Sequence, residues 1–452
     1  MKKIVLSSVA IATLALTGAN ADSTSDIAEM KAMMKQMNQR LAKLETENRQ
    51  LKTKVAQNKK AMTHKKKSTH VAAKPAHHKE ATAEEENVMQ KFAKATPTFA
   101  KASKLKFSGV HYLGFVHGNN KDHLTGKSNS YNDFESRRNY IQVKAYLFDD
   151  PKSYARITLD THQVGNGKDV NNGDVVKGGN TGDWEVRLKY AYLYINDILP
   201  YTGVEFGQAH RPWIDYEEHH GWLYRSISKT FVEKGQDADF TNSADLGVNF
   251  KTKTEYFSSE IGLFNGEGYH GLLDKDSNNG LSFEWRLTGN LLGTGEKHVH
   301  KSDTYADVSF YGQYNTSMTK KGEFNPDTGK FDGDFVWYGF NAVYNQPEFL
   351  IAGNYLKSTK ASPSYKGNGW SVNGELRLLT FDENLDDWNI IGRYDKWDLD
   401  SGESRKTWIA GLGYTWNKNV EFILNYEDDT DTRTVAIDNE TQRVLFTADV
   451  KW

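Results

Sequence analysis

The chain ends in RVLFTADVKW, residues 443–452. Apolar residues recur there at every second position, and polar residues fill the alternate positions except at Leu445. The apolar positions are Val444, Phe446, Ala448, Val450 and Trp452. The last residues of a soluble domain usually fray, so a patterned strand that stops on an aromatic residue is unexpected there. The alternation is typical of a strand that faces lipid on one side and water on the other.

The same two-residue period runs through the chain from about residue 105. In 139–147 and 281–291, apolar residues alternate with charged, amide or hydroxyl residues. About sixteen segments of roughly ten residues show this pattern. They begin near Phe107, Phe134, Tyr154, Trp184, Tyr201, Ala244, Tyr256, Leu281, Thr304, Asp334, Phe349, Trp370, Trp388, Thr407, Val420 and Gln442.

The connections between these segments alternate in length. Short ones lie at 148–151, 196–200, 345–347 and 417–419, and long ones at about 118–133, 163–183, 209–243, 266–280 and 315–332. A soluble β-sandwich would also alternate, but sixteen strands with charges of both signs in mid-strand are unusual for one. The pattern predicts an all-β transmembrane barrel of about 16 antiparallel up-and-down strands, with both ends on the periplasmic side.

The first 104 residues have a different composition. MKKIVLSSVAIATLALTGANADS combines a basic start, an apolar run and an Ala-Asn-Ala site, which predicts a signal peptide over 1–21. Apolar residues at spacings of three and four predict an α-helical coiled coil within 22–57, with Asn48 at one core position. Residues 58–104 lack large apolar residues and are expected to form a flexible basic linker before the barrel of 105–452.

Charge is distributed unevenly along the 452 residues, whose net charge is −2. Residues 1–104 carry about +11 and residues 105–452 about −13. The basic segment is not expected to bind nucleic acid, because it has few aromatic residues and belongs to an exported chain. The absence of cysteine is consistent with an exported protein that relies on no disulfide.

The segment VEFGQAHRPWIDYEEHHGWLYRSISKTFVE, residues 204–233, carries a family resemblance. It has a Gly207-Gln208 strand end, a Pro212-Trp213 step, an acid at Glu217 or Glu218, and Arg225. In this order the motif resembles the phosphate-selective porin O and P family, as do KFSGVHYLGF (106–115), the pair at 137–138 and VRLKYAYLYI (186–195). The resemblance covers most of 105–250.

The resemblance implies a trimeric barrel whose third outer loop, here about 209–243, folds inward and narrows a pore. It implies a porin for passive diffusion of small hydrophilic solutes and ions, with basic wall residues that favour anions such as phosphate. The residues expected to line the pore or bind solute are Arg138, Lys144, Arg156, Arg187, Arg211, Asp215, Glu217, Glu218, Arg225, Lys229 and Arg286.

Ion preference stays open at this point because acidic residues lie beside the basic ones. A general or cation-preferring porin is an alternative, as is a barrel whose coiled coil tethers the outer membrane to peptidoglycan. An outer-membrane barrel enzyme is a third class, but no nucleophile elbow or phosphate-binding loop occurs in the sequence. His219 and His220 are adjacent and would diverge on a strand, so we expect no metal site, no cofactor and no catalytic residue.

The expected location is the outer membrane of a Gram-negative cell, with the coiled coil in the periplasm. The expected partners are outer-membrane lipid, small ions or solutes, two further copies of the chain, and peptidoglycan near the N-terminal region. Trp452 is similar to the terminal aromatic residue of the outer-membrane assembly signal, where Phe is usual.

Overall fold

The structure is a computed structural model that describes residues 104–121, 125–146, 150–163, 184–269, 280–296, 299–432 and 440–452. The predicted signal peptide, coiled coil and nearly all of the linker lie outside these residues. Among the helices of the described residues, none is long and apolar enough to cross a membrane.

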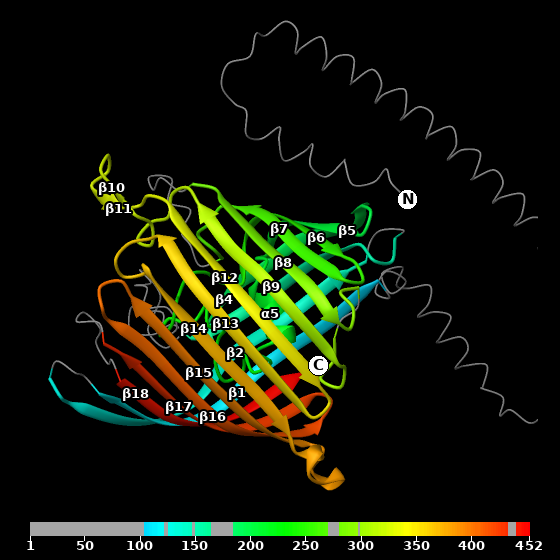
Figure 1. Ribbon diagram of the computed structural model, residues 1–452. Helices are drawn as coiled ribbons and strands as arrows, with labels where there is room; N and C mark the ends of the chain where they lie inside the picture. The colour runs from blue at the N-terminus through cyan, green and yellow to red at the C-terminus, as the bar shows by residue number, and fades with distance from the viewer. Residues whose placement is uncertain are drawn as a thin grey trace, which may run out of the picture. The chain divides into compact units, whose positions relative to one another are not determined.

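Sixteen strands form a closed antiparallel barrel, as the sequence predicted (Figure 1). The barrel strands are β1 (Leu105–Lys121), β2 (Ser128–Ala145), β3 (Tyr154–Gln163), β4 (Trp184–Leu199), β5 (Thr202–His210), β6 (Ala244–Lys253), β7 (Phe257–Phe264), β8 (Ser282–Leu292), β9 (Tyr305–Asn315), β12 (Phe335–Gln346), β13 (Phe349–Lys360), β14 (Gly367–Arg377), β15 (Trp388–Leu399), β16 (Ser404–Asn417), β17 (Val420–Asp431) and β18 (Glu440–Lys451). The remaining elements are α5 (Ile214–His220), the hairpin β10 (Phe324–Asn325) and β11 (Lys330–Phe331), and the 3-10 helices η1 (Leu378–Thr380) and η2 (Glu383–Leu385).

Trp452 closes the barrel. The last strand, β18, pairs antiparallel with β1, and the register continues to the end of the chain. The amide of Gly109 donates to the carbonyl of Trp452 at 2.9 Å, and the amide of Trp452 donates back to Gly109 at 3.1 Å. The indole lies where a Cβ on Gly109 would stand, and its ring is stacked on His111. The terminal aromatic residue is therefore a paired part of the wall rather than a frayed end.

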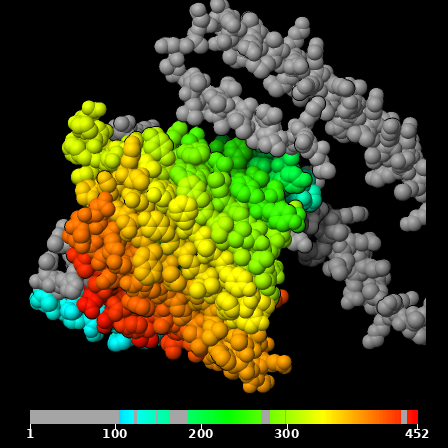
Figure 2. All heavy atoms as spheres, in the orientation of Figure 1, coloured from blue at the N-terminus to red at the C-terminus, as the bar shows by residue number. Residues whose placement is uncertain are grey.

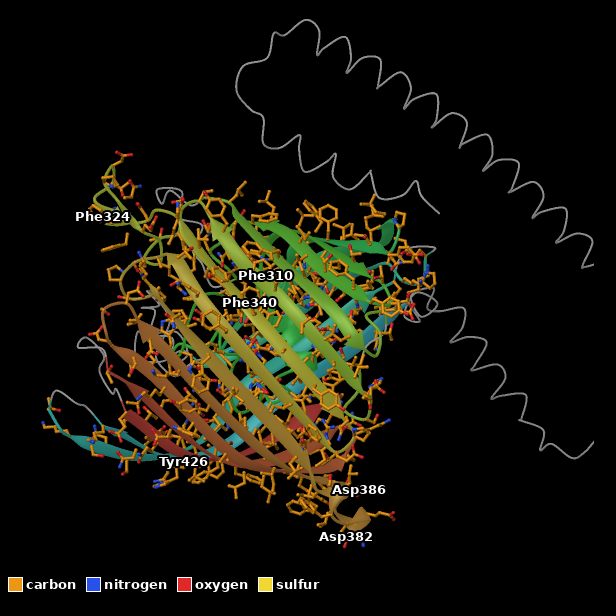
Figure 3. The ribbon with its side chains drawn as sticks, in the orientation of Figure 1. Phe310, Phe324, Phe340, Asp382, Asp386 and Tyr426 are labelled. Carbon is orange, nitrogen blue, oxygen red and sulfur yellow. The ribbon has the colours of Figure 1, made fainter. Side chains whose placement is uncertain are left out.

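The wall is apolar outside and polar inside. In β8, Phe283 faces outward, whereas Ser282, Glu284 and Thr288 are buried on the inner side. Phe310 and Phe340 lie on the outer surface of the neighbouring strands (Figure 3). Each side of the wall therefore receives every second residue, as the pleat of a strand requires.

The connections divide into a loop end and a turn end, with several departures from the predicted lengths. Of the described connections, the loop end carries 211–243 and 316–334, and the turn end carries 200–201, 254–256, 347–348 and 418–419. Residues 118–133 were predicted as a long loop, and this prediction was wrong. Residues 118–121 and 128–133 instead continue β1 and β2 as paired strands beyond the rest of the wall, because the register runs through to the pair Lys121 and Ser128.

Two connections at the turn end are longer than the alternation predicted. One is 293–304, and the other is 378–387, which contains η1 and η2 and projects from the barrel, where Asp382 and Asp386 lie (Figure 3). At the loop end, 361–366 and 400–403 are short. Length alone therefore assigns most, but not all, connections to the correct end.

Candidate functional site

Residues 211–243, here called the inner loop, follow β5 and lie inside the barrel. Trp213, Phe231 and Phe240 are buried against inward-facing residues of β9, β12, β13 and β15. The ring of Trp213 stacks on Tyr311 of β9 with a centroid distance of 3.5 Å. Helix α5 of this loop is seen within the barrel in Figure 1. The expected inward fold of this loop is therefore observed.

A second apolar cluster holds the middle of the inner loop. Trp222 packs with Ile391, Ile409 and Ile423, which come from the inner faces of β15, β16 and β17. In the sequence each of these isoleucines sits beside an outward-facing apolar residue, so that the two-residue period is interrupted. Such interruptions on three successive strands were the signal for an apolar strip on the inner wall. Leu445, the exception in the terminal strand, is likewise buried on the inner side.

Several predicted pore residues fasten the inner loop instead of facing open space. Arg211 is 2% exposed and its Nε donates to Glu284 of β8 at 2.8 Å. Arg286 of β8 donates to the carbonyl of Pro212 and pairs with Glu260 at 3.2 Å. The Arg211–Glu284 pair and the hydrogen bond to Pro212 join the loop to β8. Removing either partner of the buried pair would leave an uncompensated charge in the interior.

Within the inner loop, Arg225 joins two carboxylates. It donates to Glu233 at 2.9 Å and also to Glu218. Lys229 lies 4.0 Å from Glu233, and burial lowers the pKa of Lys229 to about 8. Arg225, Glu218 and Lys229 are therefore brought together, but as one internally balanced group.

Glu217 is 2% exposed and lies between the loop and the wall. Its carboxylate accepts a hydrogen bond from the Trp213 indole at 2.7 Å and one from Asn354 of β13 at 2.9 Å. Burial raises the pKa of Glu217 to about 7, because desolvation disfavours the charged form. It fastens α5 to the wall rather than facing the lumen.

The Gly207-Gln208 motif shapes the wall beside the loop. Gly207 has φ +125°, and a Cβ there would collide with the Ala191 carbonyl of β4. The Gln208 amide donates to the carbonyls of Leu188 and Lys189, at 2.5 and 2.9 Å, where the β3–β4 register shifts. This bulge turns both Lys189 and its neighbour Tyr190 toward the inside.

A second bulge acts on the predicted arginine pair 137–138. The register between β1 and β2 shifts next to Tyr112, so that two successive arginines of β2 face inward. Arg137 donates to the Ser226 carbonyl of the inner loop at 2.9 Å and to Thr447 at 2.7 Å. Arg138 lies 3.6 Å from Asp160 of β3, which also pairs with Arg187 at 3.0 Å.

Three cations stand side by side on the inner wall near the turn end. Lys106 of β1 is the register partner of Lys144 of β2, which in turn is the partner of Arg156 of β3. Like charges placed directly opposite each other destabilise a sheet. We call Lys106, Lys144 and Arg156 the cationic row. Among the residues that the structure describes, no carboxylate forms an ion pair with any of the three.

Tyrosines contact two members of the cationic row, Lys144 and Arg156, where carboxylates would be expected. The Lys144 ammonium lies 4.5 Å from the centre of the Tyr154 ring. The Arg156 guanidinium lies 4.6 Å from the centre of the Tyr190 ring and donates to the Tyr192 hydroxyl at 3.2 Å. Lys189 follows the same rule, since it donates to the Tyr140 hydroxyl at 2.9 Å. Aromatic faces and phenol oxygens orient a cation without cancelling its charge.

Helix α5 presents the opposite charge to this wall. Asp215 and His219 have 40% and 46% of their side chains exposed, whereas Ile214 and Glu217 on the same helix are buried. Asp215 lies 3.7 Å from His210, which contacts Glu205 of β5 at 3.0 Å. From the sequence, His219 and His220 were placed in a loop and expected to diverge as on a strand, but α5 places them on successive helical positions. In the described part of the chain, no three His, Asp or Glu side chains are grouped to hold a metal ion.

The structure thus separates the predicted residues into four groups. Among the described residues, Lys144 and Arg156 of the wall and Asp215 of α5 have no buried carboxylate or arginine partner, and Arg138 and Arg187 share Asp160. Arg211, Arg286 and Glu217 join the loop to the wall, whereas Glu218, Arg225 and Lys229 pair within the loop. Sequence reasoning missed Lys106, although its alternation with Phe107 placed it on the polar face of the first strand. It also did not pair the row across three strands, because pairing requires the register.

Comparison with known proteins supports the fold. No family model matches the chain, and no curated protein matches it in sequence. OprB of Pseudomonas putida has a TM-score of 0.55 at 10% identity, over 80% of this chain and 97% of its own. An anion-selective porin from Comamonas acidovorans has a TM-score of 0.52 at 10% identity, over 77% of this chain and 99% of its own. The chain therefore has the barrel fold of a porin.

Proposed function

We propose that this chain forms a water-filled channel in the outer membrane of a Gram-negative cell, for passive diffusion of small hydrophilic solutes with a preference for anions. The cationic row carries the proposal. Three adjacent cations without carboxylate partners cost stability, and a channel for anions gives a reason for keeping them. Passive diffusion makes and breaks no bond, so the function proposed is that of a channel and not of an enzyme.

The cationic row and α5 form the selective part of the passage. An anion that passes roughly 5 Å from one fixed cation in water gains about 0.8 kcal/mol, which raises its local concentration about fourfold. Salt weakens the attraction over a Debye length of about 10 Å at 0.1 M. Inorganic phosphate is the anion that the family resemblance suggests. Asp215 opposes this preference from α5 and favours the second candidate, a general or cation-preferring channel.

The proposed assembly is a trimer held by the coiled coil expected within 22–57. The turn end, which holds Leu105 and Trp452, would face the periplasm, with the basic linker reaching toward peptidoglycan. Cross-linking of the full chain in cells tests this part, since a monomer with no peptidoglycan adduct would contradict it.

Neutralising the row tests the proposed preference. We expect the triple variant Lys106→Gln, Lys144→Gln, Arg156→Gln to lose most of its anion preference. Under a KCl gradient, its reversal potential should move away from the chloride equilibrium potential and toward zero. Lys330→Gln, on the exposed hairpin β10–β11, is the matched control and should behave as wild type. A triple variant with the wild-type reversal potential would refute the assignment of selectivity to the row.

A further inference from the structure

A groove of about 560 Å³ lies on the outer face of the wall, away from the channel. Its floor is the register pair Ala342 and Gly353, on β12 and β13. A Cβ on Gly353 would meet nothing closer than the Ser371 carbonyl at 3.8 Å, so the backbone there would accept a side chain. The groove is deep at this point because glycine has none.

A row of aromatic side chains forms one wall of this groove. Phe310, Phe340, Tyr355 and Trp370 are successive register partners across β9, β12, β13 and β14. The rings of Phe310 and Phe340 lie 5.1 Å apart, and both are seen on the outer wall in Figure 3. These strands occupy the centre of the face shown in Figure 2. The groove thus opens to the outside of the barrel and is lined chiefly by apolar side chains.

The aromatic row continues into two lysines. Trp370 is the register partner of Lys396 on β15, which is the partner of Lys406 on β16. Both lysines lie within three residues of the loop ends of their strands, as does Lys357 on β13. Two like charges directly opposite each other are again unfavourable.

Nearby carboxylates balance only part of this positive charge. Lys396 contacts Asp398 at 2.7 Å, and Asp334 pairs with Lys360 at 2.7 Å. Among the residues that the structure describes, none forms an ion pair with Lys357 or Lys406. Near its loop end, the outer wall beside the groove therefore keeps positive charge without an ion-pair partner among the described residues, at Lys357 and Lys406, next to an apolar surface.

We propose that this groove binds one acyl chain of a phosphorylated glycolipid in the outer leaflet, whose phosphate contacts Lys396 and Lys406. The inference rests on the outer-membrane location in the proposed function and goes beyond the channel. The lysines favour an anionic lipid over a second copy of this chain, because a copy would need matching carboxylates and much more than this groove to form a stable interface. Lysine side chains at this level extend their ammonium groups to the headgroups while their stems pack on apolar surface.

Two variants separate the apolar and charged parts of the site. Gly353→Leu fills the groove, and Gly392→Leu is its control, because Gly392 also faces outward and no described heavy atom lies within 4 Å of a Cβ there. Lys396→Gln with Lys406→Gln removes the charge, and Lys330→Gln is the control for a lysine elsewhere. Binding of bisphosphorylated lipid A to the purified full chain is measured by native mass spectrometry, beside its dephosphorylated form.

We expect wild type and both controls to bind the bisphosphorylated lipid about equally. Gly353→Leu should lose at least about tenfold in affinity for both lipids. The double lysine variant should lose about tenfold for the bisphosphorylated lipid only, and wild type should prefer that lipid by a similar factor.

Three results would overturn the proposal. These are wild-type binding by Gly353→Leu, equal affinity of wild type for the two lipids, and a change in the number of copies per assembly caused by Gly353→Leu. Channel recordings of the same samples separate this inference from the proposed function. Loss of the channel with retained lipid binding would contradict only the function, and loss of lipid binding with a normal channel only the inference.

Discussion

Replacing Trp222 by Ala should release the middle of the inner loop. Trp222 is 1% exposed and packs against isoleucines of three strands. Its indole donates to the Ser228 carbonyl at 2.7 Å, and the Arg393 guanidinium lies 4.7 Å from its ring centre. The truncation removes all of these contacts at once and leaves a void between loop and wall.

The expected cost is large for one segment. Truncation of a buried Trp costs about 3–5 kcal/mol, and the lost cation–π contact adds about 0.5–2 kcal/mol. In the cluster that Trp222 joins, the other buried loop residues are Tyr224 and Ile227. Without the indole, these two residues and the hydrogen bond from Arg137 to the Ser226 carbonyl hold the segment less firmly. The segment 222–228 should therefore become more mobile, while the apolar cluster around Trp213 still holds the start of the loop.

Single-channel recording measures the consequence. We expect Trp222→Ala to show higher open-channel noise and higher mean conductance than wild type. Trp408→Ala is the matched control, because Trp408 is 58% exposed on the outer face of β16, next to Ile409. Wild-type conductance and noise in Trp222→Ala would refute the reasoning that this cluster holds the loop across the lumen.

Two further predictions concern the wall and the loop anchor. Gly207→Ala should lower the free energy of unfolding by about 1–3 kcal/mol, because Gly207 has a positive φ and a Cβ there would collide with the Ala191 carbonyl. Gly392→Ala, the control, should leave it unchanged. Urea unfolding in micelles measures both variants, and equal midpoints would contradict the prediction. In the folded state the pKa of Glu217 is raised to about 7, whereas in the unfolded chain it is about 4.5. The folded state therefore binds a proton that the unfolded chain releases between these values. The free energy of unfolding should fall by on the order of 3 kcal/mol as pH rises from about 4.5 to 7. Glu217→Gln should reduce this slope in melting experiments across that range, and an unchanged slope would show that other groups cause it.

The sequence predicted the barrel because the wall obeys a local rule. Alternation and turn residues depend on neighbours along the chain, and the predicted strand starts at Tyr154, Trp184, Ala244, Phe349 and Val420 coincide with those observed. The extended hairpin of β1 and β2 was missed because its polar residues on both faces resemble a loop.

The site was predicted less well because it depends on pairing across the barrel. In the sequence Arg211 was predicted to line the constriction. The structure shows that it pairs with Glu284, which lies 73 residues further along the chain. The bulge at Lys189 is stabilised by Gln208 of the next strand. In VRLKYAYLYI its only sign is that the apolar residues change from even to odd positions after Leu188. The cationic row exists only in the register of three strands, so each of its members looks ordinary in the sequence.

The reversal potential of the purified wild-type protein in a planar bilayer under a KCl gradient tests the central claim most directly. The cationic row predicts a potential displaced toward the chloride equilibrium potential, and inorganic phosphate should then reduce the chloride current. A potential displaced toward the potassium equilibrium potential would contradict the anion preference and assign control to Asp215. Folded protein that forms no channels at all would contradict the proposed function itself.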